Sequence, residues 1–242
     1  MVQRTIPGQE ANMKSPKIRL MITAPLLIVA FVVGRHLDTR GSEADAISVE
    51  DPHYAFLADY IQKYNPAVEP AESDALARAI MKHSRNLRIP ESAKIDGEPV
   101  EPELLVTAFI ETESTFKKYA VSSANARGYM QLMYDTVRWM NVKYNTGADL
   151  NQLHDTDLNV RLGVTYLNFL FEEMKDPRLV ALSYNAGPGN VSRGYYIERY
   201  WIKIRRHYRK ARTEQEIAFS QISEEQRLAY LQKGPASEKS VD

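Results

Sequence analysis

Apolar residues recur at helical spacing through the middle of the chain, most clearly in residues 104–116. The apolar positions of this run follow the three-and-four spacing of one helix face: Leu105, Val106, Phe109, Ile110 and Phe116. Glu113 falls on that face, where a core residue is expected. Glu111 lies two positions earlier, so it falls with Thr107 and Thr115 on another side. The pattern therefore predicts a buried Glu113 and a Glu111 that points away.

The same spacing predicts further helices on both sides of this run. They are expected at residues 54–64, 73–86, 136–144, 153–174, 199–212 and 213–232. Ser73 and Asp135 are placed to cap two of them. Val137, Met140 and Val142 are expected to pack in the core, and Gly163 is expected where elements pack closely. Residues 89–102 contain prolines and Asp96-Gly97 and are predicted to form a loop. The sequence predicts a mainly α fold.

An apolar run at residues 20–34 follows several basic residues, which is the layout of a signal sequence or signal anchor. The run has no polar face and contains Pro25, which disfavours a buried helix of the globular part. We favour an uncleaved anchor over a cleaved signal, with translation starting at Met1 or Met13. Basic residues before the run place the rest of the chain outside the cytoplasm, on the periplasmic face of the inner membrane, or soluble in the periplasm if the segment is cleaved.

These patterns divide the chain into four parts. Residues 1–36 form the basic N-terminus and signal or anchor segment, and residues 37–72 form a linker and short helix. Residues 73–212 are expected to form the main helical domain. Residues 213–242 form a C-terminal helix and a disordered tail.

Composition narrows the partners and cofactors. The 242 residues contain 31 Lys and Arg and 31 Asp and Glu, so net charge gives no reason to expect nucleic acid. Cysteine is absent, which excludes disulfides and thiolate metal sites. The five histidines show no metal-ligand spacing, so we expect neither a metal nor a cofactor.

Burial disfavours an ionised carboxylate, so the pKa of Glu113 is expected to be raised and the side chain to be protonated near neutrality, as a general acid requires. By periodicity alone, a buried structural carboxylate paired with Arg or backbone donors is the favoured interpretation. The residues that come after this helix favour the catalytic interpretation.

The stretch resembles the catalytic core of the soluble lytic transglycosylase (SLT-domain) family of the lysozyme-like superfamily. The matching residues are Glu113, Ser114, Phe116, Ala120, Ser122, Ala126, Gly128, Met130, Gln131, Leu132 and Met133. A second signature comes later in the right order, at Tyr184, Asn185, Ala186 and Gly187. Between them, Asn159, Val160, Gly163, Tyr166 and Leu167 resemble a third family helix.

The resemblance implies a mainly helical, lysozyme-like domain that cleaves peptidoglycan. The implied reaction is non-hydrolytic cleavage of the β-1,4 bond between N-acetylmuramic acid and N-acetylglucosamine, giving 1,6-anhydro-muramic acid ends. Glu113 would be the single general acid and base, and the hydroxyl of Tyr184 would lie against its carboxylate. Ser122 would lie nearby. The residues expected to bind the glycan strand are Ser114, Ser122, Gly128, Met130, Gln131, Met133, Tyr184, Asn185, Ala186, Gly187 and Tyr200.

The sequence also departs from the family pattern, with Asn125 in place of Gly, Tyr129 in place of Leu and Tyr134 in place of Pro. A hydrolytic muramidase or chitinase-like enzyme stays open, because Asp135 or Asp149 could supply the second carboxylate that hydrolysis requires. A peptidoglycan-binding assembly protein without turnover is a third interpretation. We further hypothesise that the anchor, residues 89–102 and the tail confine cleavage to one place, around an envelope-spanning assembly.

Overall fold

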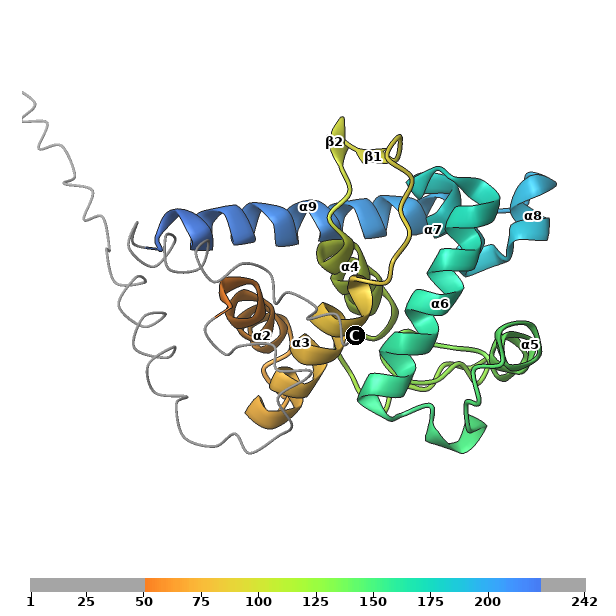
Figure 1. Cartoon of the computed structure of the whole chain (residues 1–242), viewed down its shortest axis with the longest axis horizontal. Coiled ribbons are helices and arrows are strands. Elements are labelled where there is room, and N and C mark those ends of the chain that lie inside the picture. The colour runs from red at the N-terminus through yellow and green to blue at the C-terminus, as the bar shows by residue number, and fades with distance from the viewer. Residues whose placement is uncertain (1–50, 223–242) are drawn as a thin grey trace, which may run out of the picture.

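The computed structural model describes residues 51–222, and this part of the chain is almost entirely helical (Figure 1). Its elements are α2 (Pro52–Tyr64), α3 (Pro70–Ser84), β1 (Lys94–Ile95), β2 (Glu98–Pro99), α4 (Pro102–Ser114), α5 (Tyr134–Tyr144), the 3₁₀ turn η1 (Leu150–Gln152), α6 (Thr156–Met174), α7 (Pro177–Ala186), α8 (Pro188–Ser192) and α9 (Glu198–Ser220). The predicted mainly α class is confirmed.

The predicted anchor at residues 20–34 and the predicted tail from residue 234 lie outside the described residues. Within residues 51–222, no helix combines the length and apolar character needed to cross a bilayer.

Prolines set the start of several helices. The first helical position is a proline in α2, α3, α4, α7 and α8, where the missing N–H costs nothing and the fixed φ suits the helix.

The prediction that Ser73 caps a helix is wrong, because α3 already begins at Pro70 and the Ser73 hydroxyl donates to the Pro70 carbonyl at 2.9 Å. The Asp135 prediction is wrong as well. Helix α5 begins one residue earlier, so Asp135 lies inside its first turn.

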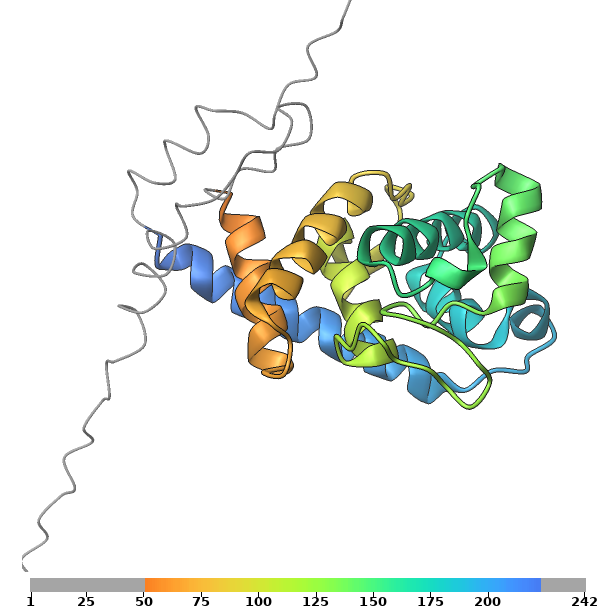
Figure 2. The same cartoon turned by 90° about the horizontal axis from the view of Figure 1, so that it is seen from below.

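Helix α4 lies at the centre of the molecule, between α3 on one side and α9 on the other (Figures 1 and 2). Every residue from Leu104 to Glu111 is buried. A helix enclosed on all sides has no solvent face, so its polar residues are buried with the rest. The prediction that Glu111 points away from the core is therefore wrong: only 6% of its surface is exposed.

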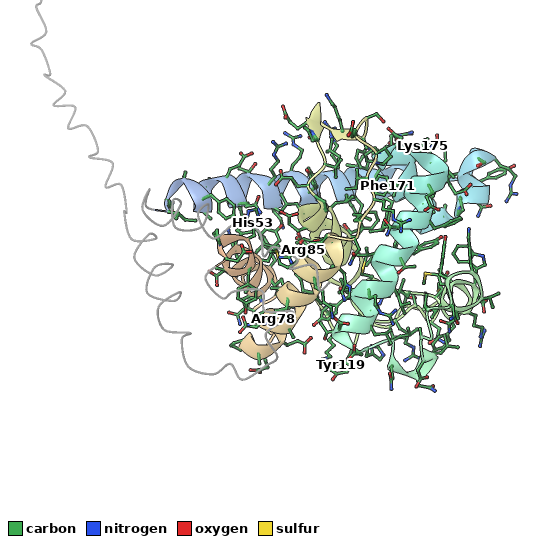
Figure 3. All side chains as sticks on the ribbon, viewed as in Figure 1. His53, Arg78, Arg85, Tyr119, Phe171 and Lys175 are labelled. Carbon is green, nitrogen blue, oxygen red and sulfur yellow. The ribbon has the colours of Figure 1, made fainter. Side chains whose placement is uncertain are left out.

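Helix α9 is the longest element of the described residues, at 23 residues, and runs along one side of the domain (Figure 1). Tyr200, Ile204 and Tyr208 are buried on one side, as their helical spacing predicted. The separate helix predicted from residue 213 is wrong, because α9 continues without a break to Ser220. Its second half packs against α2, where the His53 ring lies 4.7 Å from the Phe219 ring (Figure 3 labels His53).

Residues 89–102 contain a small hairpin where a loop was predicted. Strands β1 and β2 pair antiparallel around Asp96 and Gly97, whose φ angles of 57° and 89° are those of a tight hairpin turn. Asp96 accepts hydrogen bonds from the Arg205 guanidinium, with its Oδ1 2.6 Å from Arg205 Nε, and also lies 3.4 Å from Arg209 Nε. These contacts fix the hairpin on α9, beyond which it projects (Figure 1).

Of two further predictions about the core, one is partly wrong and the other is confirmed. Val137 and Met140 are buried, whereas Val142 is 87% exposed, contrary to the predicted packing. Gly163 does occupy a close contact: a Cβ there would lie 2.0 Å from Met130 Sδ, so only glycine fits without displacing the methionine.

Candidate active site

The site is centred on Glu113, in the last turn of α4, and on Tyr200, in the first turn of α9. The Tyr200 hydroxyl donates a hydrogen bond to Glu113 Oε1. Glu113 was predicted to be buried, but part of its surface is exposed, whereas Tyr200 is buried. Desolvation raises the pKa of Glu113 to about 7, against the opposing effects of the Tyr200 hydrogen bond and the positive charge of Lys203. The predicted raised pKa is confirmed, and the carboxyl group can exchange a proton near neutral pH.

Tyr184 does not make the contact predicted from the resemblance. Its hydroxyl donates to the Met130 carbonyl at 2.8 Å, while Tyr200 donates to Glu113. The Tyr184 ring packs 4.9 Å from the Phe109 ring of α4. Tyr184 still lies near the site, because the negative charge of Glu113 contributes, after desolvation, to raising its pKa. Tyr184 therefore supports the backbone of the signature loop, and Tyr200 contacts the carboxylate.

The loop from Thr115 to Met133 connects α4 to α5 and carries most of the first signature. It begins with left-handed conformations at Thr115 and Phe116, with φ of 51° and 57°, so Phe116 lies beyond the helix although it is fully buried. The side chain of Gln131 then donates to the carbonyls of Ala120 at 3.1 Å and Gly128 at 2.9 Å. Gln131 thus closes the loop on itself.

Asn159 of α6 holds this loop from behind. Its side chain accepts from the Met130 N–H at 2.8 Å and donates to the Leu153 and Arg127 carbonyls. Gly128 has φ of 77°, and a Cβ there would lie 2.4 Å from the Asn159 amide nitrogen. The signature glycine is required both by its backbone conformation and by this close approach.

The other predicted site residues divide into buried supports and exposed positions. Ser114 is buried and donates to the Ile110 carbonyl at 3.0 Å. Ser122, predicted near Glu113, accepts instead from the Ala126 N–H at 3.0 Å and so shapes a turn. Met130 is fully buried, whereas Met133 and Asn185 are exposed. Ala186 and Gly187 are partly exposed, and Gly187 ends α7 with φ of 81°.

Sequence reasoning missed Glu72 of α3, which fixes the same loop from the opposite side. Its carboxylate accepts hydrogen bonds from Tyr129 at 2.7 Å and Thr156 at 2.6 Å, and an ion pair from Lys118 at 2.6 Å. Hydrogen bonds from Lys118, Thr156 and Tyr129 lower the pKa of Glu72 despite its desolvation. The departure at Tyr129 was the available signal, since a tyrosine in place of leucine brings a hydroxyl that must find a partner when buried.

The remaining departures cause little disturbance. Tyr134 is the first residue of α5, a position that also suits proline, so the backbone path is the same with either residue. Asn125 adopts φ of 66°, which asparagine tolerates better than most residues. Both substitutions keep the local geometry that the family pattern requires.

The two candidates for a second carboxylate have other roles. Asp135 is exposed and pairs with Arg138 at 2.8 Å, and Asp149 accepts from the Asn151 N–H to cap η1. Within residues 51–222, the groups that shift the pKa of Glu113 include no other carboxylate. The same residues contain no group of three or more His, Cys, Asp and Glu side chains arranged to hold a metal ion.

The described part of the chain is thus a helical domain whose central helix ends in a protonatable glutamate, and a tyrosine hydroxyl contacts that glutamate. Residues 91–200, which include Glu113 and Tyr200, match the family described as the transglycosylase SLT domain. Over these residues the chain is similar to the SLT-domain family.

Individual relatives carry related names. The chain is 26% identical over 197 residues to membrane-bound lytic murein transglycosylase C of Histophilus somni (strain 2336), covering 72% of this chain and 52% of the relative. It is 31% identical over 108 residues to the protein of the same name in Yersinia pestis (strain Pestoides F), covering 40% of this chain and 30% of the relative. The chain thus spans about half or less of the length of these relatives.

Solved structures give a partial match. An inactive mutant of lytic transglycosylase Slt from Pseudomonas aeruginosa aligns with a TM-score of 0.45 at 21% identity, over 69% of this chain and 30% of that one. The 70-kDa soluble lytic transglycosylase of Escherichia coli aligns with a TM-score of 0.42 at 19% identity, over 69% and 29%.

Proposed function

We propose that this protein is a peptidoglycan lytic transglycosylase in which Glu113 is the single general acid and base. The observation that carries the proposal is the state of Glu113: its pKa of about 7 lies where a group can give up and take back a proton in one cycle. The match of residues 91–200 to the SLT domain and the names of the relatives support the proposed substrate class, the glycan strands of peptidoglycan.

The chemistry divides into two proton transfers. Glu113 in its protonated form gives its proton to the glycosidic oxygen as the bond from that oxygen to C1 of N-acetylmuramic acid breaks. The Glu113 carboxylate then takes the proton of the C6 hydroxyl while O6 attacks C1, which closes the 1,6-anhydro ring and restores the acid. The substrate's own N-acetyl group stabilises the positive charge between the two steps, so no second carboxylate is needed.

Tyr200 and the signature loop have distinct parts in this proposal. Tyr200 favours the ionised form of Glu113, which limits how far desolvation raises its pKa. The residues proposed to form the glycan site come from the end of α4, the signature loop and the end of α7: Ser114, Ser122, Gly128, Met130, Gln131, Met133, Tyr184, Asn185, Ala186 and Gly187. Several of them act by shaping the loop, because Ser114, Gly128 and Met130 are buried.

We further propose an envelope location, since the relatives are named membrane-bound enzymes and an apolar run comes after basic residues at the N-terminus. Retention by that segment would keep the domain beside the wall. Confinement of cleavage to one envelope assembly remains a hypothesis. It predicts that deleting residues 223–242 disturbs localisation but leaves activity on isolated wall intact; loss of both would overturn it.

The test is mass analysis of the sugars released from purified peptidoglycan by the full chain and by Glu113→Gln. Products ending in 1,6-anhydro-muramic acid, absent with the variant, are the expected result. Reducing-end muramic acid would show that water attacks and would identify a hydrolase. Glycan binding without any product from the unsubstituted protein would identify a binding protein.

A further inference from the structure

Helix α9 has seven Lys and Arg side chains, and they divide into two groups. Four have carboxylate partners. Arg205 and Arg209 pair with Asp96 of the hairpin, and Lys210 pairs with Glu111. Arg212 pairs with Glu101 and Glu216, at 3.4 and 3.1 Å.

The other three are Arg199, Lys203 and Arg206, here called the basic stripe. All three are exposed, and no carboxylate of residues 51–222 lies within ion-pair distance of them. Their spacing of four and then three residues places them on one face of the helix. Seven residues at 1.5 Å per residue make the stripe roughly 10 Å long.

The basic stripe begins at the candidate active site. Arg199 precedes Tyr200, whose hydroxyl donates to Glu113, and Lys203 lies about one turn further along the helix. The charge of Lys203 acts on Glu113 directly, because it opposes the rise in the pKa of that carboxyl group. A ligand held at Glu113 therefore has unpaired positive charge immediately beside it.

We infer that the basic stripe binds the acidic peptide stems of peptidoglycan, so that strands carrying stems are bound in preference to bare glycan. The inference rests on the proposed function. A stem is attached to the muramic acid next to the scissile bond and has free carboxylates. Three or four extended residues cover roughly 10 to 13 Å, which matches the length of the stripe.

An anionic membrane surface is the main competing partner for exposed cations. Membrane-binding clusters usually contain about four to eight basic residues, and the stripe has three. The stripe also adjoins the reacting groups, where a membrane would obstruct a glycan strand. Peptide carboxylates fit both its size and its place.

The experiment measures binding of the full chain, in detergent and with Glu113→Gln to prevent turnover, to soluble glycan strands with stems and to strands whose stems an amidase has removed. Arg199→Gln with Arg206→Gln is expected to weaken binding to stem-bearing strands roughly 3- to 10-fold, as removal of two exposed ion pairs does. Binding to bare strands is expected to be unchanged. Roughly 0.5 M salt is expected to abolish the difference between binding to stem-bearing strands and binding to bare strands.

Arg205→Gln with Arg209→Gln is the matched control, because it removes the same charge from the same helix, at two side chains that already pair with Asp96. Equal loss with this control would overturn the inference in favour of a long-range charge effect. Equal loss on both kinds of strand, or no loss on either, would overturn it too. A loss confined to vesicles of phosphatidylglycerol would assign the stripe to the membrane.

The outcome is separable from that of the proposed function. Stem-selective binding without anhydro products from the unsubstituted protein would refute the transglycosylase proposal and leave the stripe standing. Anhydro products without stem selectivity would support the transglycosylase proposal and refute the role of the basic stripe.

Discussion

Glu111 and Glu113 are the same chemical group two residues apart on one helix, and their surroundings drive them in opposite directions. Glu111 accepts hydrogen bonds from Tyr60 at 2.8 Å and from Lys210, and its Oε1 lies 2.7 Å from His207 Nδ1. Desolvation raises its pKa, but the contacts from His207, Lys210 and Tyr60 outweigh that effect and leave the pKa below the ordinary value.

Glu113 has a much smaller set of partners. Tyr200 donates one hydrogen bond, and Lys203 acts from further away, so desolvation prevails and the pKa rises to about 7. The difference shows that burial alone does not make an acid: Glu111 is the more buried of the two by exposed surface, yet it is held ionised. The number of cations and donors within reach decides.

The packing of the helices explains the division. Glu111 is enclosed by α2 and the middle of α9, which bring Tyr60, His207 and Lys210 together. Glu113 is one half-turn further on, where only the first turns of α9 reach it. One carboxylate fastens three helices, and the other exchanges protons.

The largest expected effect separates the two residues by activity. Glu113→Gln is expected to lower the rate of anhydro-sugar release at least ~10³-fold, within the range for loss of a general acid. The rate of anhydro-sugar release by Glu111→Gln, per folded molecule, is expected to stay within about tenfold of that of the unsubstituted protein, because the role of Glu111 is structural. Initial rates on purified peptidoglycan, normalised to folded protein by circular dichroism, measure both. If Glu111→Gln were folded but as inactive as Glu113→Gln, the assignment of a purely structural role to Glu111 would be wrong.

The next largest effect is on stability, because the Glu111 and Glu113 variants are expected to change the free energy of unfolding in opposite directions. Glu111→Gln leaves Lys210 and Tyr60 without their charged partner, and is expected to lower the free energy of unfolding at pH 7.5 by about 2–4 kcal/mol, since Lys210 is partly exposed. Glu113→Gln removes the cost of burying an ionised group and is expected to raise it by about 1–2 kcal/mol. Urea denaturation measures both, with exposed Glu173→Gln as the neutral control.

The pH dependence of these differences comes from the two pKa shifts. The folded-state pKa of Glu111 is lowered, so its contribution is present above its unfolded pKa and is lost as pH falls through the folded value. The folded-state pKa of Glu113 is raised, so its contribution is present below about 4.5 and is lost as pH rises through about 7. The gain from Glu113→Gln should therefore shrink as the pH is lowered and vanish below about pH 4.5. A gain that persisted there would contradict the assigned cause.

The sequence located the acid correctly but misjudged its neighbour, for a physical reason. An apolar stripe predicts which residues are buried only when the helix has a solvent face, and α4 has none over residues 104–111. Nothing in the local pattern distinguishes a central helix from a surface one. The partners of Glu111 lie at Tyr60 and Lys210, 51 and 99 residues away, so their arrival depends on the whole fold.

Other features show the same division between local and long-range information. The close contact of Gly163 and the burial of Val137 and Met140 were predicted from residue type and spacing. The choice between Tyr184 and Tyr200 as donor to Glu113 was not, since both tyrosines lie near the carboxylate and only the packing of α7 and α9 decides which hydroxyl reaches it. Residue chemistry predicted the membership of the site, and tertiary packing set its hydrogen bonds.

The hydrogen bond from Tyr200 sharpens the comparison through the pH profile. Tyr200 favours the ionised form of Glu113, so Tyr200→Phe is expected to raise the pKa of that carboxyl group and move the alkaline limb of kcat/KM upward by about one pH unit. Tyr184→Phe is the matched control. Its hydroxyl donates to the Met130 carbonyl, so the limb should stay in place even if the rate falls. A limb that moved downward with Tyr200→Phe, or moved equally with both, would refute the assignment.

The smallest effect concerns Lys203, which acts on Glu113 by charge alone. Lys203→Gln is expected to move the alkaline limb upward by only about 0.3 pH unit, because an exposed charge is screened by solvent. Raising salt to about 0.5 M should shift the unsubstituted protein upward until it coincides with the variant, since the Debye length falls below the separation of the two groups. Arg205→Gln removes an equal charge that Asp96 already neutralises, and it should leave the limb unmoved. A salt-independent shift with Lys203→Gln would mean that the lysine acts by contact, which would bring Glu113 closer to the arrangement of Glu111.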